Sequence, residues 1–131
     1  MKKVTYLAVF EPSDNGSFSI YFPDFPGCFS YGADFNKASR MAQKALALHY
    51  YEMEKAHDLI PEPSLSLDPE DTEGNLISPI TIFPEYYAEE QRNKRVKTNT
   101  TIPAWLKAKA EENGLNFSHV LENALIQMLA E

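Results

Sequence analysis

The chain has 131 residues, of which 44% are apolar, and this is enough for one domain with a hydrophobic core. Its formal net charge of −7 argues against a general nucleic-acid-binding protein, and its single cysteine, Cys28, excludes an internal disulfide framework. No run of residues resembles a membrane span or a signal segment, so we expect a cytoplasmic protein in which Cys28 is a small core residue.

The first 60 residues predict three strands and a long helix. Asn15-Gly16 marks a hairpin turn because both residues tolerate positive φ values, and two prolines make the bend over residues 23–28 rigid. Asp34 is a good N-cap for the helix. The expected elements are strands over residues 4–10, 17–22 and 29–31 and a helix over residues 34–57. The helix stripe expected to cover the sheet comprises Ala38, Met41, Ala42, Ala45, Leu48 and His49.

The middle of the chain is predicted to connect two parts. A turn over residues 60–63 precedes an acidic loop, which we interpret as a solvated connector in preference to a partner-binding element. A fourth strand is predicted over residues 80–83, where Pro79 and Pro84 bound a short β-branched run. Residues 85–94 are mostly polar and are interpreted as a hinge between domains.

The C-terminal end of the chain predicts a strand followed by two helices. β-branched residues over 96–102 favour the strand, and Pro103 ends it because proline lacks an N–H donor and suits the first position of a helix. That helix is expected to extend to about Asn113, before Gly114 supplies a left-handed residue and Asn116 caps a second helix. Apolar residues of the second helix recur at helical spacing and form one wide face. They are Phe117, Val120, Leu121, Ala124, Leu125, Met128 and Leu129.

Charge divides the chain unevenly. Residues 1–90 hold six Lys and Arg against fifteen Asp and Glu, a net charge of −9, whereas residues 91–131 hold six against four, a net charge of +2. All six basic residues of the second part precede Glu111, so a basic patch surrounds the predicted strand, where DNA phosphates would need neutralising. The acidic part suggests a different, basic partner.

A strand and two helices of this size cannot bury two apolar helix faces alone, so a second copy is needed. Strand, Pro-started helix, Gly turn and apolar helix in this order resemble the ribbon-helix-helix family of DNA-binding dimers, whose paired strands enter the major groove. The resemblance implies that Lys97, Asn99 and Thr101 face the bases, and each of these side chains can bind a base edge. The first helix is about a turn shorter than in many members of that family.

The same resemblance implies two further sets of residues. The implied phosphate contacts are Arg95, Lys94, Lys107, Asn116 and Ser118. The implied dimer core comprises Ile102, Trp105, Leu106, Leu115, Val120, Leu121, Ala124, Leu125 and Met128. The alternative is an ordinary helical hairpin that closes a small core, but it leaves the polar face of the strand unexplained.

The N-terminal sequence resembles the antitoxins of the HicB family. The resemblance rests on Gly16, the alternating aromatic residues after it, the run Phe22-Pro23-Asp24-Phe25-Pro26-Gly27-Cys28, Ser30, Gly32 and the capped Ala-rich helix. It implies an α+β fold, with a degenerate RNase H-like β-β-β-α-β domain followed by a ribbon-helix-helix (β-α-α) dimerisation domain. We expect a toxin-binding domain over residues 1–84, a linker over 85–95 and a DNA-binding and dimerisation domain over 96–131, with Asp24 and Phe25 at the toxin interface.

This resemblance implies an antitoxin that occludes the active site of a HicA-type toxin, a small basic RNA-cleaving protein. It also implies a homodimer, or a dimer of dimers, that represses its own operon at operator DNA. The alternative is a transcriptional repressor whose N-terminal domain senses a small ligand. No enzyme activity, cofactor or metal is expected, because Asp14, Asp24 and Asp34 occupy turn, bend and cap positions and the histidines lack metal-ligand spacing.

Overall fold

The computed structural model describes residues 2–130, and the chain divides into two compact units, Met1–Lys94 and Arg95–Glu131. We call them the N-terminal unit and the C-terminal unit. The N-terminal unit contains strands β1 (Val4–Pro12), β2 (Phe18–Tyr21), β3 (Phe29–Gly32) and β4 (Leu76–Ile82) and helices α1 (Phe35–Lys55) and α2 (Pro84–Asn93). The C-terminal unit contains helices α3 (Ala104–Glu112) and α4 (Phe117–Leu129).

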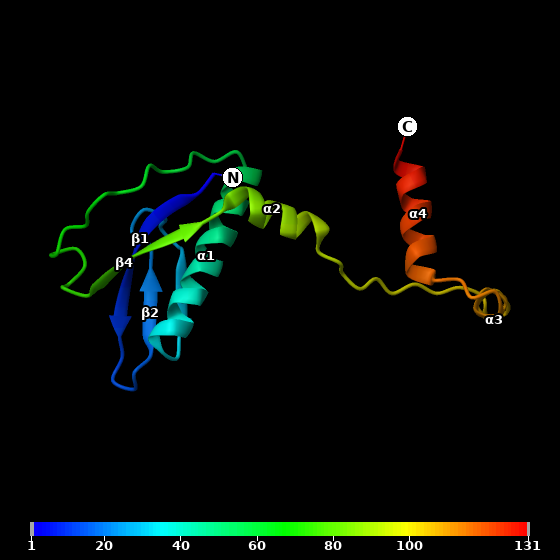
Figure 1. The fold of residues 1–131 in the computed structure, drawn as a ribbon, viewed down its shortest axis with the longest axis horizontal. Coiled ribbons are helices and arrows are strands. Elements are labelled where there is room, and N and C mark those ends of the chain that lie inside the picture. Colours follow the sequence, from blue (N-terminus) through cyan, green and yellow to red (C-terminus); the bar gives the residue numbers. More distant parts are fainter. Residues whose placement is uncertain (1, 131) are drawn as a thin grey trace. The chain divides into compact units, whose positions relative to one another are not determined.

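The four strands form one antiparallel sheet in the order β3-β2-β1-β4, and α1 packs on it (Figure 1). A tight turn joins β1 to β2. In this turn Gly16 has a φ of +86°, and the Asn15 side chain accepts a hydrogen bond from the Ser17 N–H at 3.1 Å. The predicted Asn-Gly hairpin is therefore confirmed.

Alternate strand residues face α1 and form a core with its small and apolar residues. From β1, the core residues are Tyr6, Ala8 and Phe10. Burying one aromatic side chain stabilises the fold by about 1.5–3 kcal/mol. Asp34 caps α1 as predicted, since its carboxylate accepts from the Lys37 N–H at 2.8 Å. The core comprises Tyr6, Ala8, Phe10, Ile20, Phe22, Phe25, Cys28, Ala38, Ala42, Leu46, Ala47, Tyr50, Ile80 and Ile82.

The start of α1 approaches β3 very closely at Gly32. A Cβ added to Gly32 would lie 2.2 Å from the backbone nitrogen of Ala38, so no larger residue fits without moving the helix. This contact also fixes the orientation of β3. Gly32 and Ser30 face α1, and the intervening residues face away from it.

Two details of the N-terminal unit differ from the sequence prediction. Strand β4 begins at Leu76 and includes Pro79, which was expected to precede it; β4 lies at the sheet edge, where a missing N–H donor is tolerated. On α1, Met41 and Leu48 are exposed instead of covering the sheet. Their places in the core are taken by Leu46, Ala47 and Tyr50.

Residues 84–93 form helix α2, where a linker starting at residue 85 was expected. Pro84 occupies its first turn, which suits a residue without an N–H donor. The helix packs on α1, and the rings of Tyr51 and Tyr87 meet edge to face with centroids 5.5 Å apart. The N-terminal unit therefore extends to Lys94.

The segment between α1 and β4 is tied to the rest of the unit at several points. The Tyr6 hydroxyl donates to the Pro61 carbonyl at 2.6 Å, and the Asp24 carboxylate accepts from the N–H and the hydroxyl of Ser64 at 2.8 and 2.6 Å. The acidic part is also ordered, because successive turns stabilise residues 68–75 and Thr72 is buried. Its acidic residues are nevertheless exposed, as expected for a solvated connector.

The C-terminal unit has the predicted pair of helices. Pro103 precedes α3, Gly114 ends it with a φ of +64°, and Asn116 caps α4. Residues 94–103 form no strand ladder in the single chain that the structure describes. A lone ribbon strand has no partner for its backbone groups, so the predicted strand over 96–102 is not formed within one chain.

Candidate functional site

The C-terminal unit holds most of the predicted functional residues, and it has no core of its own. Among residues 95–130, no side chain is buried. Trp105 is 69% exposed, and even Leu121, the least exposed large apolar residue of α4, is 37% exposed. The residues predicted for a dimer core therefore form an apolar surface in the single chain.

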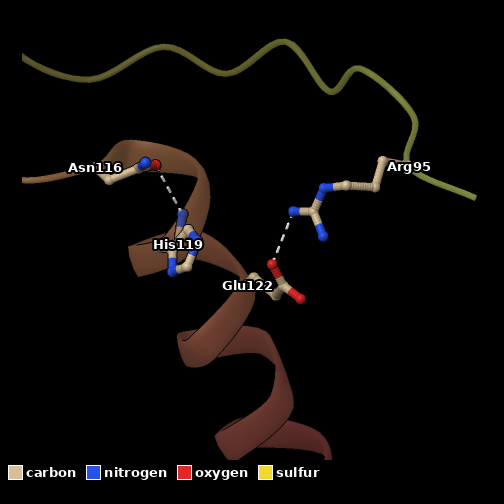
Figure 2. Close-up of polar contacts among 4 residues, drawn as sticks. All are labelled: Arg95, Asn116, His119 and Glu122. Carbon is tan, nitrogen blue, oxygen red and sulfur yellow. Dashed lines mark hydrogen bonds and ion pairs between the residues drawn. The ribbon is translucent and has the colours of Figure 1, made fainter. Parts of the chain in front are cut away.

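Helix α4 is capped by Asn116 and has no acidic side chain in its first turn. The Asn116 carboxamide oxygen accepts from the His119 N–H at 3.1 Å (Figure 2). The first amides of such a helix can donate to a phosphate. Since the Asn116 oxygen is used in the cap, only its side-chain NH2 group is left as a donor for the predicted phosphate contact, and Ser118 is exposed in the first turn.

Arg95 forms an ion pair with Glu122 at 2.8 Å, and both side chains are exposed (Figure 2). The hydrogen bond from Arg95 is the main cause that lowers the pKa of Glu122, and the same bond raises the pKa of Arg95. The pair joins the start of the predicted ribbon to α4. An incoming phosphate would therefore compete with Glu122 for Arg95.

The other residues predicted to contact DNA are also exposed to solvent. Lys97, Asn99 and Thr101 are all exposed in residues 94–103. Lys94 is exposed as well. The Lys107 Nζ atom lies 4.0 Å from Glu111 Oε1, and an exposed ion pair of this length is weak. Residues 94–103 form no strand ladder within one chain, so a common strand face for Lys97, Asn99 and Thr101 would require pairing with a second chain.

Two predicted toxin contacts lie within the N-terminal unit's own packing. Phe25 is 1% exposed and packs edge to face against Tyr6, with ring centroids 4.5 Å apart. Asp24 holds Ser64 with both carboxylate oxygens. The Pro-rich bend therefore has a structural role, and Phe25 cannot contact a toxin without leaving the core.

Cys28 is a core residue, as expected. Its side chain is buried, and burial raises the pKa of the thiol to about 11, so it remains protonated at neutral pH. Within residues 2–130, no three His, Cys, Asp or Glu side chains are grouped so that they could hold a metal ion. None of the described helices combines the length and apolar character needed to cross a membrane.

The chain is similar to a known protein family and to solved structures. A family model described as a HicB-like antitoxin of bacterial toxin-antitoxin systems matches residues 6–124. A chain of a toxin-antitoxin complex from Streptococcus pneumoniae has a TM-score of 0.61 and 24% identity, covering 97% of this chain and 99% of that chain. No curated protein matches significantly.

Two solved antitoxins are also similar in fold. The antitoxin HicB3 has a TM-score of 0.53 and 24% identity, covering 98% of this chain and 100% of that chain. The N-terminal domain of the Burkholderia pseudomallei antitoxin HicB has a TM-score of 0.51 and 16% identity, covering 61% of this chain and 99% of that chain. These likenesses agree with a mixed α+β fold built on a four-stranded antiparallel sheet.

Proposed function

The chain belongs to the family of HicB-like antitoxins of bacterial toxin-antitoxin systems, and we propose that it neutralises a HicA-type toxin and represses its own operon. The observation that carries this proposal is the match of the family model to residues 6–124. Antitoxins of this family are not enzymes. We assign the protein to the cytoplasm, where its toxin and its DNA would be found.

Toxin binding is assigned to the N-terminal unit. Support comes from charge, since this unit holds eight Lys and Arg against fifteen Asp and Glu, a net charge of −7, and the proposed toxin is basic. We interpret the β-β-β-α-β part as a degenerate RNase H-like domain. The proposed toxin-binding domain covers residues 1–84, and α2 occupies most of the linker proposed over residues 85–95.

Dimerisation is assigned to the C-terminal unit, as a ribbon-helix-helix domain over residues 96–131. Its apolar residues are exposed in one chain, and burying each large side chain would contribute roughly 1.5–3 kcal/mol. A second copy would cover them and would also pair the strand over residues 96–102. The resulting dimer, or dimer of dimers, would present Lys97, Asn99 and Thr101 to the bases.

An inhibition experiment tests the antitoxin function. The purified product of the neighbouring reading frame is assayed for RNA cleavage with and without the full chain. Stoichiometric inhibition supports the proposal. A chain that leaves cleavage unchanged, or co-purifies with a bound metabolite instead, would support the ligand-sensing repressor.

Operator binding is tested with two substitutions, one at a proposed base contact and one at a proposed phosphate contact. Asn99→Ala should cost about 1–3 kcal/mol and relax preference at one base position of each half-site. Lys107→Ala should weaken all sequences alike and flatten the salt dependence, because phosphate contacts carry no sequence information. Equal loss of specificity in both variants, measured by titration of operator and random DNA, would contradict the assigned strand face.

A further inference from the structure

The sheet face opposite α1 carries exposed aromatic rings at its β3 edge. Phe29 and Tyr31 are 69% and 54% exposed, and they point away from α1 because Gly32, next in the strand, contacts Ala38 of α1. They alternate with Ser30 on the helix side. This alternation of aromatic and small residues is visible in the sequence of β3.

The strand register shows which residues of β2 and β1 lie beside these rings on the same face. Phe29 lies opposite Tyr21 on β2, and Tyr21 lies opposite Val9 on β1. Tyr31 lies opposite Ser19, which in turn lies opposite Glu11. Side chains directly opposite on neighbouring strands stand about 4.5–5.5 Å apart at Cβ, so the rings and the Glu11 carboxylate share one surface.

Two further carboxylates come from the ordered acidic turn before β4. The negative charges of Glu11, Glu73 and Asp71 act on the Tyr21 hydroxyl and, after burial, are the causes that raise its pKa. Asp71 and Glu73 flank Thr72, which is buried, so the turn that carries them packs on the unit. Backbone bonds such as Gly74 N–H to Pro69 O at 3.2 Å order the backbone that carries these carboxylates. We call this surface the aromatic–acidic face, made of Glu11, Tyr21, Phe29, Tyr31, Asp71 and Glu73.

Cations are confined to other parts of the N-terminal unit. Residues 4–36 and 56–91 contain no Lys or Arg, so β1 to β4 and the acidic turn carry none. Helix α1 alone holds four of the unit's eight basic residues. The strands and the acidic turn therefore carry negative charge without a basic residue of their own, and Lys2 and Lys3 lie just before β1.

Resting on the proposed antitoxin function, we infer that the aromatic–acidic face docks in the RNA-binding groove of the toxin by imitating single-stranded RNA. Proteins bind single-stranded RNA with a basic groove for phosphates and with planar groups on which bases stack. Carboxylates and exposed rings on one rigid surface offer the same two kinds of group. A second copy of this chain is disfavoured as the occupant, because its matching face would bring like charges together.

The experiment uses the full chain, the purified product of the neighbouring reading frame and a labelled single-stranded RNA that this product binds. The chain should displace the RNA competitively. Phe29→Ser/Tyr31→Ser should raise the dissociation constant for the toxin by about tenfold or more while the salt dependence stays steep. Glu11→Gln/Asp71→Asn/Glu73→Gln should raise it by a similar factor at low salt and flatten the salt dependence.

Matched controls remove exposed large side chains and carboxylates from the helical side of the unit. They are Met41→Ser/Tyr86→Ser for the apolar pair and Glu54→Gln/Glu85→Gln/Glu90→Gln for the charges. Asp68 is left unchanged because its carboxylate accepts from the Glu70 N–H at 2.9 Å and supports the turn. Circular dichroism confirms that each variant is folded.

The controls should bind the toxin more tightly than the corresponding face variants. Face variants that bind as tightly as the controls, or a stable ternary complex of chain, toxin and RNA, would overturn the inference. In both cases inhibition by the unmodified chain would leave the proposed antitoxin function intact. Failure of the unmodified chain to inhibit the toxin would instead contradict the antitoxin function itself.

Discussion

The two units of this chain differ in how many side chains they bury. The N-terminal unit buries fourteen core residues between a four-stranded sheet and α1, and side-chain hydrogen bonds of Tyr6 and Asp24 hold the segment before β4 to it. The C-terminal unit has well-capped helices, yet among residues 95–130 it buries no side chain. Local sequence signals can therefore specify capped helices that have no buried core of their own within one chain.

The largest effect is expected from a charge on the apolar face of α4. Leu121→Asp should abolish dimerisation and operator binding together, because burying a carboxylate without a partner costs far more than removing the leucine side chain. The N-terminal unit should keep its own stability. Sedimentation velocity and DNA titration measure the two effects, and a dimeric, DNA-binding variant would show that this face lies outside the interface.

A cavity in the N-terminal core should have the next largest effect and should leave dimerisation alone. Phe10 is fully buried and its ring centroid lies 5.2 Å from that of Phe35, so Phe10→Ala should cost about 3–5 kcal/mol. Phe29→Ala is the control on an exposed ring and should change stability by less than about 0.5 kcal/mol. Urea unfolding measures both, and equal costs would contradict the assigned core.

A smaller effect is expected where the acidic segment is held to the sheet. Asp24→Ala removes both bonds to Ser64 and should cost about 1–3 kcal/mol, because the Ser64 N–H loses its charged acceptor. Asp24→Asn retains one acceptor oxygen and should lose less. Faster hydrogen exchange at the Ser64 amide reports the release, and unchanged exchange in the alanine variant would show that the bond is not formed in solution.

The smallest change in stability is expected at the exposed Arg95–Glu122 pair. Glu122→Gln should leave the melting temperature unchanged, because both side chains are in solvent and such pairs are screened. It should strengthen binding to all DNA sequences, since Arg95 no longer has a competing carboxylate. Glu112→Gln, which removes an acid of the same unit away from this pair, should strengthen DNA binding less; an equal gain would indicate general charge alone.

Local signals in the sequence predicted much of the fold. The Asn-Gly hairpin, the Asp34 cap, the Gly114 ending and the Asn116 cap all follow from backbone chemistry within a few residues, and all are present. What failed depended on tertiary context. The sequence cannot show that β4 is an edge strand, so Pro79 was interpreted as its boundary.

Helix α1 and the acidic segment illustrate the same limit. Because α1 has alanines on several sides, the sequence does not show clearly which side of the helix faces the sheet. The pattern predicts Met41 and Leu48 in the core, whereas the structure has Leu46 and Tyr50 there. Long-range bonds, such as that from Tyr6 to Pro61, leave no local pattern. The DNA-reading residues remain predictions, because their alignment requires the paired ribbon.

Thermal unfolding of the full chain at several protein concentrations tests the contrast between the units most directly. We expect two transitions: one from the N-terminal unit, with a midpoint independent of concentration, and one from the C-terminal unit, with a midpoint that rises with concentration because folding and dimerisation are coupled. Leu121→Asp should remove only the second. A single transition that does not depend on concentration, in a chain that sediments as a monomer, would contradict this contrast.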